Sequence, residues 1–256
     1  MRPVFIFAPY LMGNFSPSRA AMGRHNWRLI TVVPLDGTPT ERMGALCRAV
    51  ADEVAAIRAN GNLPVVVVGD CTFSIGVLAG LQRQTPDLTL VWYDAHGDFN
   101  THQTSPSGFV GGMPLAMLCG RGEQTILAGA GAKIHPEANI ILTDGRDLDP
   151  GEAEAVAESN IVHLPNVADL TSQDFSKAPV YIHFDSDVLQ LTDLSAVNYP
   201  AEGGPSLQTV ADSLAYLAGT GQVAAISVTM WNPELDTNNT AEQTVITLIE
   251  DLIDQL

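Results

Sequence analysis

Short apolar runs recur along the chain and are separated by more polar segments. Each run is continuous, whereas a strand with one face in solvent would alternate between apolar and polar residues. Continuous runs of this length are typical of strands that are covered on both faces of a parallel sheet. The pattern predicts six strands, over Val4–Ala8, Pro64–Val68, Leu88–Tyr93, Asn139–Leu142, Val180–Phe184 and Val223–Val228.

Segments with a helical period separate these runs. Apolar residues three and four positions apart mark one face of a helix over 43–57, for which Thr40 is the predicted N-cap. The same spacing predicts helices over 207–217 and 245–256. Because strands alternate with helices, the chain is predicted to form a single α/β domain over residues 1–256, with a mostly parallel, doubly wound sheet.

The composition limits the classes of function. Of the 256 residues, 46% are hydrophobic and 16% are charged, which is enough apolar material for a buried core. The formal net charge of −17 repels phosphate backbones and anionic membrane surfaces, so we expect no nucleic-acid and no membrane partner. Three cysteines without paired spacing indicate a reduced, cytoplasmic protein, and no apolar run approaches the ~20 residues that span a bilayer.

The segment LVWYDAHGDFN carries the strongest chemical signal. An apolar strand leads directly into Asp94, His96 and Asp98, and the period of two in extended chain points these side chains to one side. Polar groups beside a buried strand are costly unless they are compensated, and a bound cation would compensate them. The alternative is that the aspartates cap a following helix and that the histidine is solvated.

A second segment, VYIHFDSDVL, repeats this arrangement with Asp185 and Asp187, although turn aspartates alone would explain it equally well. Parallel strands bring their carboxyl ends to one edge of a sheet, so the two segments together predict four carboxylates and one imidazole in one place. Carboxylates crowded in this way stay ionised only with cations. An oxygen-rich set favours Mn²⁺ over Zn²⁺, and two ions roughly 3.5 Å apart suit hydrolysis by a bridging hydroxide.

Three further stretches follow strand ends. The string PVVVVGDCTFSIG places Cys71 just after a predicted strand. Its spacing alone indicates an inert, buried cysteine that behaves as a small hydrophobic residue. The periodicity fails between Phe99 and Pro114, and again from Gln190 to Pro205. Long loops after the strands of such a sheet are more often functional than idle.

With these motifs the sequence resembles a known family. The strings DAHGDFNT, TSPSG, GRDLDPGE (145–152) and FDSDVL are similar, in this order, to the arginase branch of the ureohydrolases. The resemblance implies a three-layer α-β-α fold with a mostly parallel sheet and a cluster of two Mn²⁺ ions per chain. It also implies that a metal-bridging hydroxide attacks a guanidinium carbon. Homo-oligomers are common in the family, but the sequence does not decide whether the apolar final helix packs within the domain or against a neighbour.

The resemblance also assigns roles by position. Asp94 and Asp185 would bridge both metals. His96 and Asp187 would complete the deeper metal, whereas Asp98 and Cys71 would complete the outer one, and Asp98 would orient the hydroxide. An amino-acid substrate would be held at four positions, with the α-carboxylate on Asn100, Ser105 and Ser107 and the α-amino group on Asp149.

Three positions depart from the family pattern. Cys71 stands where a metal-binding histidine is expected, and a thiolate is softer than the ligands that Mn²⁺ prefers. Gly111 stands at the place of the general-acid histidine. His102 or His183 would substitute for it, unless both are ordinary histidines. Met230 replaces the glutamate that binds the guanidinium, a contact typically worth ~1.5–3 kcal/mol. Two other carboxylates, Glu234 and Asp236, follow closely in the sequence.

The predicted function is therefore hydrolysis of a linear amidine C–N bond in a small guanidino amino acid. The candidate substrates are L-arginine and Nω-hydroxy-L-arginine, with release of urea or hydroxyurea and ornithine. One alternative is a family member that acts on another guanidino or formimino compound. Another is a metal-binding pseudoenzyme with a regulatory role, which the losses at Gly111 and Met230 favour and the retained aspartates oppose.

Overall fold

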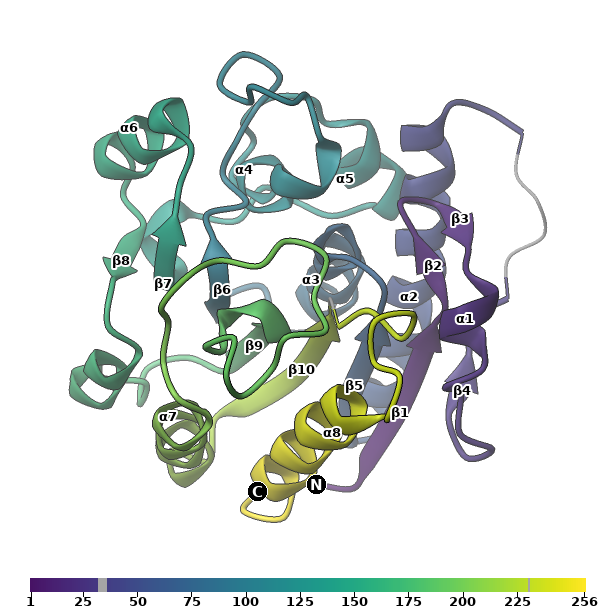
Figure 1. The fold of residues 1–256 in the computed structure, drawn as a ribbon. Helices are drawn as coiled ribbons and strands as arrows, with labels where there is room; N and C mark the ends of the chain where they lie inside the picture. Colours follow the sequence, from purple (N-terminus) through teal and green to yellow (C-terminus); the bar gives the residue numbers. More distant parts are fainter. Residues whose placement is uncertain (32–35, 230) are drawn as a thin grey trace.

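A central sheet of eight strands organises the computed structural model, which describes residues 1–31, 36–229 and 231–256 (Figure 1). Every neighbouring pair of its strands is parallel. In spatial order the strands are β4 (Arg28–Leu29), β1 (Pro3–Ala8), β5 (Leu63–Val68), β10 (Val223–Thr229), β9 (Val180–Asp185), β6 (Thr89–His96), β7 (Ile140–Asp147) and β8 (Val162–Leu164). A small antiparallel hairpin, β2 (Tyr10–Leu11) and β3 (Asn14–Phe15), stands apart from this sheet.

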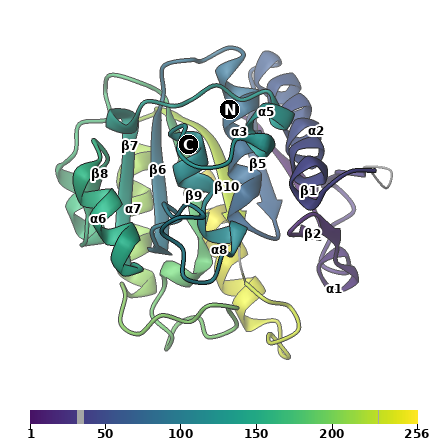
Figure 2. The ribbon, with the colours of Figure 1, turned by 90° about the horizontal axis from the view of Figure 1, so that it is seen from above.

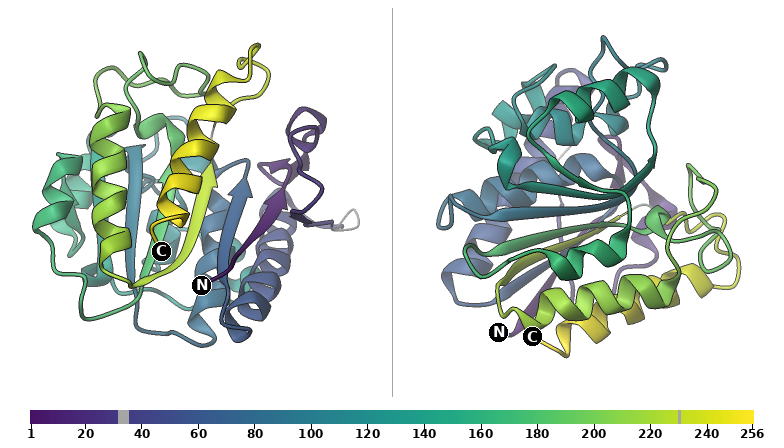
Figure 3. Two further views of the ribbon diagram at one scale, coloured as in Figure 1. Left: turned by 90° about the horizontal axis from the view of Figure 1, so that it is seen from below. Right: turned by 90° about the vertical axis from the view of Figure 1, so that its left-hand side faces the viewer.

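Helices cover both faces of the sheet, so the predicted three-layer α/β fold is confirmed (Figure 3, right). Figure 2 shows α2 (Pro39–Ala59), α3 (Ser74–Gln82) and α5 (Thr125–Ala130) together on one side. On the opposite face lie α7 (Leu207–Gly219) and α8 (Thr240–Ile253). The remaining α-helices of the described ranges are α1 (Pro17–Ala20), α4 (Pro114–Leu118) and α6 (Pro150–Glu158).

Two hydrophobic cores, one on each face, explain why the strands are continuously apolar. Along β5, Val66 and Val68 belong to the core that contains α2, whereas Val65 and Val67 belong to the core that contains α7 and α8. Because successive side chains of a strand point to opposite faces, a strand between two helical layers has no position that faces solvent, and apolar residues dominate it. All six predicted strands are present, and β7 runs past the predicted Leu142 to Asp147.

Two predicted helix boundaries were wrong. The N-cap of α2 is Thr38 rather than Thr40: the Thr38 hydroxyl accepts a hydrogen bond from the Glu41 N–H, and the Glu41 carboxylate accepts one from the Thr38 N–H. Pro39 fits the first helical position because its missing N–H would have no partner there. The last helix ends at Ile253 and not at 256.

Two predictions from composition can be compared with the fold. Cys47, Cys71 and Cys119 are all free, as their odd number and spacing predicted. None of the helices in the described ranges has the length and apolar character needed to cross a membrane.

Candidate metal centre and substrate cavity

The strand ends meet at a cavity of about 220 Å³. All six predicted metal ligands line it: Cys71 after β5, Asp94, His96 and Asp98 at the end of β6, and Asp185 and Asp187 at the end of β9. The four predicted substrate-binding residues, Asn100, Ser105, Ser107 and Asp149, line the same cavity. The convergence that was predicted from two separate motifs is therefore present in the structure.

Hydrogen bonds fix the carboxylates at these strand ends. The Trp92 indole donates to Oδ2 of Asp94 at 3.0 Å, and the His96 N–H donates to Oδ1 of the same carboxylate at 2.7 Å. Oδ1 of Asp185 accepts from the Asp187 N–H at 2.9 Å. Each carboxylate that these bonds hold is at most 2% exposed.

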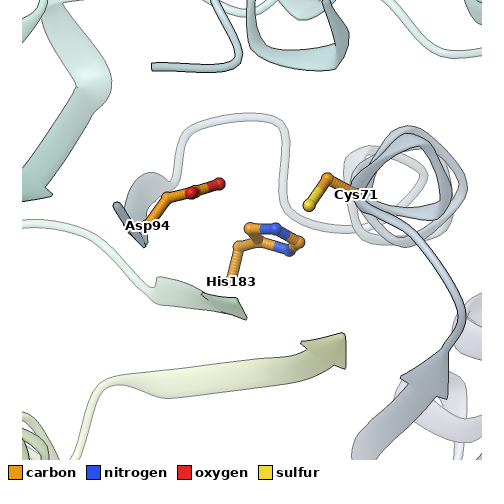
Figure 4. Close-up of side chains that lie close together, drawn as sticks. All are labelled: Cys71, Asp94 and His183. Atoms are coloured by element: carbon orange, nitrogen blue, oxygen red, sulfur yellow. The ribbon is translucent and has the colours of Figure 1, made fainter. Parts of the chain in front are cut away.

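Donor atoms gather in two groups that share one residue. Asp94, His96 and Asp187, here called the His96 group, have donor atoms within 4.8 Å of one another. The same holds for Cys71, Asp94 and His183, here called the Cys71 group (Figure 4). That Asp94 belongs to both groups agrees with the bridging role that the resemblance assigns to it.

The exposure of the side chains differs from the predicted depth of the two metals at His96, although Asp187, also expected at the deeper metal, is only 2% exposed. Cys71 and Asp98, expected at the outer metal, are 4% and 5% exposed. The His96 side chain, expected at the deeper one, is 26% exposed and lies edge-on to the ring of Tyr199. The reason is that Cys71 begins a turn that is buried under α2, whereas His96 is the last residue of β6. The end of the cluster that contains Cys71 and Asp98 is therefore the deeper one.

The electrostatics of the cluster favour a cation. Burial, followed by the charge of Asp187, raises the pKa of Asp94 to about 6, and burial raises the pKa of Asp98 and Asp185 well above the usual range. Among the described residues that line the cavity there is no lysine or arginine to compensate these charges. Oδ2 of Asp98 is also buried without a hydrogen-bond partner in the described part of the chain. Divalent ions would satisfy both deficits, so this donor set fits a metal centre.

The carboxylates of the cluster raise the pKa of both Cys71 and His96. Burial, followed by the charge of Asp185, raises the pKa of the Cys71 thiol, which donates a hydrogen bond to Oδ2 of Asp185 at 2.9 Å. Burial alone would lower the pKa of His96, but its hydrogen bonds with Asp187 and Asp94 raise it to about 12.

The string GRDLDPGE positions the walls of the cavity. Arg146 pairs with Asp144 and donates to the backbone carbonyls of Asp187, Val188, Ala201 and Glu202, which holds the chain that follows β9. Asp149 caps α6 and accepts a hydrogen bond from the Asn100 amide at 3.0 Å.

Sequence reasoning did not single out Glu152 of the same string. Its buried carboxylate lines the cavity and accepts hydrogen bonds from the N–H groups of Phe99 and Asp149. Burial raises the pKa of Glu152 to about 7. A side chain at Gly97 would collide with Glu152, so the glycine of DAHGD lets the carboxylate approach β6. Glu152 is part of the string GRDLDPGE, in which the resemblance assigned a role to Asp149 only.

Neither predicted substitute for the general acid lines the cavity. The side chain of His102 is 51% exposed, and its Nε2 lies 3.5 Å from Glu123. His183 is fully buried, and burial lowers its pKa to about 3, so its imidazole is uncharged at neutral pH and is a poor general acid. Neither position favours the proton-shuttle role.

The place of the missing general acid is filled by an aromatic ring. A Cβ atom built on Gly111 would collide with the ring of Phe109. This ring packs against Tyr199 with their centroids 5.3 Å apart, and both side chains line the cavity. An apolar wall therefore stands where the family pattern has an imidazole.

The missing guanidinium partner is not supplied by neighbours in sequence. Met230 itself lies outside the described residues. Glu234 accepts a hydrogen bond from Ser18, and Asp236 accepts two from the N–H groups at the start of α8. Neither carboxylate lines the cavity, so neither replaces the family's glutamate.

Fold and site together define an α/β protein with a carboxylate-rich cluster that could hold cations at the carboxyl edge of a parallel sheet, an arrangement used by metal-dependent hydrolases. The model of the Arginase family matches residues 10–253, and the chain belongs to this family, whose members are ureohydrolases.

Individual relatives agree with this assignment. The chain is 33% identical over 216 residues to an arginase of Bacillus subtilis (strain 168), across 79% of this chain and 73% of the relative. It is 32% identical to an arginase of Bacillus caldovelox, across 75% and 69% of the two chains. The crystal structure of arginase from Bacillus subtilis superposes with a TM-score of 0.84 at 25% identity, over 99% and 98% of the two chains.

Proposed function

We propose that the chain is a dinuclear manganese hydrolase, built as a single domain, that cleaves a C–N bond of a guanidino amino acid. The observation that carries this proposal is the joint lining of one cavity by the buried carboxylate cluster and by the four predicted substrate-binding residues. Asp94 and Asp185 would bridge two cations, with Cys71 and Asp98 at one end and His96 and Asp187 at the other. The cations would supply positive charge and a water activated for attack.

The side chains of the cavity explain how a substrate would be held. Asn100, Ser105 and Ser107 offer amide and hydroxyl donors on one loop, and Asp149 offers a carboxylate that already contacts Asn100. This pairing suits an α-carboxylate and an α-amino group on the same carbon. The reacting group would then extend toward the aspartates. The phenyl ring of Phe109 and the phenol of Tyr199 would exclude water beside it.

The wall at Phe109 favours Nω-hydroxy-L-arginine over L-arginine, the substrate suggested by the names of the relatives. L-Arginine carries a strongly basic guanidinium, which needs a carboxylate partner and a proton donor for its leaving group. The ring of Phe109 fills the donor's usual place, and Glu234 and Asp236 do not reach the cavity. A hydroxyguanidine is less basic and depends less on a carboxylate partner. We further propose a cytoplasmic location and a homo-oligomer.

A panel of substrates tests the function. Manganese-loaded protein is incubated with L-arginine, Nω-hydroxy-L-arginine, agmatine and N-formimino-L-glutamate, and urea, hydroxyurea and formamide are measured. We expect kcat/KM for Nω-hydroxy-L-arginine to exceed that for L-arginine by roughly 10- to 100-fold, the value of one charge-assisted contact. Agmatine as the best substrate would contradict the α-carboxylate site. No release from any compound would favour the pseudoenzyme.

Substrate anchoring is tested by Asn100→Ala and Ser107→Ala. Each removes a donor from the loop that faces the proposed α-carboxylate, so KM should rise roughly 10-fold or more while metal content stays at the wild-type value. Gln103→Ala serves as the control, because Gln103 is exposed on the same loop and does not line the cavity. An unchanged KM in both variants would mean that this loop does not bind the substrate.

The apolar wall is tested by restoring the histidine. Gly111→His alone should fail to accommodate its side chain, because Phe109 occupies the space. In the double variant Gly111→His/Phe109→Ala the imidazole has room and can protonate a leaving amine. We therefore expect kcat for L-arginine to rise roughly 100-fold above that of Phe109→Ala, the low end of what general acid catalysis contributes. Equal rates in these two proteins would show that no proton donor is missing at Gly111.

A further inference from the structure

His183 is a buried polar side chain, and only one of its two ring nitrogens has a hydrogen-bond partner among the described residues. Its Nδ1 lies 2.8 Å from the hydroxyl of Ser227, which in turn lies 2.7 Å from the hydroxyl of Tyr181. Nε2 is buried, and no atom of the described residues forms a hydrogen bond with it. A buried polar atom without a partner typically costs about 1–3 kcal/mol.

The ring of His183 lies between the ends of two other donors. Figure 4 shows it beside Cys71 and close to Asp94. One donor atom from each of these three residues lies within 4.8 Å of the other two, a spacing that a single cation with bonds of about 2.0–2.3 Å can bridge. Since Nδ1 is engaged by Ser227, Nε2 is the nitrogen that remains free to bind.

The surroundings hold the ring in this position. The imidazole packs on the indole of Trp92 with centroids 3.8 Å apart, and the same indole donates a hydrogen bond to Asp94. Metal-binding histidines typically use their second ring nitrogen for a hydrogen bond that sets the tautomer and the ring orientation. The contact between Nδ1 and Ser227 provides such a bond.

We infer that His183 is a ligand of the metal centre, which binds a cation through Nε2 together with Cys71 and Asp94 at the deeper end of the cluster. The inference rests on the proposed metal-dependent function and changes its ligand set. The imidazole that the family pattern places at position 71 is, in this chain, supplied by the neighbouring strand β9. Sulfur, nitrogen and oxygen donors together suit a borderline cation such as Zn²⁺ or Co²⁺ better than an all-oxygen set would.

Metal titration of the full-length chain tests this ligand. Metal-free protein is titrated with Mn²⁺ and with Co²⁺, calorimetry gives stoichiometry and affinity, and the visible and near-ultraviolet spectrum of bound Co²⁺ reports its donors. His183→Asn keeps an amide near the position of Nδ1 but lacks Nε2. At one of two sites it should lose more than the roughly 10- to 100-fold in affinity that is typical when a group behind a ligand is removed, and it should shift the visible cobalt bands. His183→Gln, which places an amide oxygen near Nε2, should recover part of the loss.

The control is His135→Asn, because His135 is also buried but belongs to neither group of donor atoms. It should bind metal as the wild type does. Identical affinities and cobalt spectra in wild type and His183→Asn would overturn the inference. Failure of the wild type to bind any cation would overturn both the metal centre and this ligand. Two bound cations with the His183 effect, but without hydrolysis of any guanidino compound, would refute the proposed function alone.

Crystals of the wild type soaked with Zn²⁺ provide a test that does not depend on the folding of a variant. Anomalous scattering locates the ions. A distance of about 2.0–2.1 Å between Nε2 of His183 and an ion is the expected result. An ion bound by Cys71 and Asp94 with His183 out of bonding range would show that the imidazole is not a ligand.

Discussion

Asp185→Ala and Asp94→Ala are each expected to reduce the metal content from two ions per chain toward none, and hydrolysis with it. Each carboxylate is proposed to contact both ions, so its loss weakens both sites at once. The bound metal should also stabilise the wild type: an ion present at 100 times its dissociation constant adds about 2.7 kcal/mol per site to the free energy of unfolding. For a chain of this size the melting temperature changes by roughly 2–4 °C per kcal/mol.

The measurements for these variants are elemental analysis and melting curves with and without Mn²⁺. Both variants should show almost no rise in melting temperature on addition of Mn²⁺, whatever the stability of the metal-free protein. Asp174→Ala is the matched control, since Asp174 is exposed and precedes the same strand, β9, at its opposite end. Two ions per chain in Asp185→Ala would show that this carboxylate is not a bridge.

The sheet was predictable because its strands obey one simple pattern. Strands between two helical layers are apolar at every position, as in β5, and such runs stand out in a sequence. Helix α3 was missed for a related reason. All residues from Ser74 to Leu81 are buried, so the helix has no polar face and no amphipathic period to detect. The two-residue strands β2, β3 and β4 are too short for any period.

The residues of the site that could be predicted are those in motifs at the ends of strands. The parallel order β9–β6 brings Asp94 and Asp185 together, and β5 adds Cys71 from beyond β10. The sequence could not show how deeply each side chain is buried or which side chains from distant segments come into contact. The placement of Phe109 over Gly111, the burial of the Cys71 end, and the position of His183 beside Cys71 depend on side-chain packing between segments far apart in the chain.

Cys71→His is expected to raise the affinity for Mn²⁺ at the deeper end of the cluster, and Cys71→Ser is expected to lower it. The sulfur already lies at the sheet edge, 2.9 Å from Oδ2 of Asp185, so a ligand at this position reaches the ions. Imidazole is a harder ligand than thiolate and suits Mn²⁺ better, whereas a neutral hydroxyl binds more weakly than either. Titration of the three proteins with Mn²⁺ measures the order, and the near-ultraviolet sulfur-to-metal band of the Co²⁺ form should be absent from both variants.

The control for the Cys71 variants is Cys47→Ser, because Cys47 is buried in the same core but donates its thiol to the carbonyl of Thr72 and does not line the cavity. This variant should keep both sites and the sulfur-to-cobalt band of the wild type. If His183 is a ligand, Cys71→His places two imidazoles at one end of the cluster, and its gain in Mn²⁺ affinity should shrink when His183→Asn is added. Identical two-site binding by wild type, Cys71→His and Cys71→Ser would mean that the thiol is a neutral buried group. The deeper ion would then depend on its carboxylates and on His183.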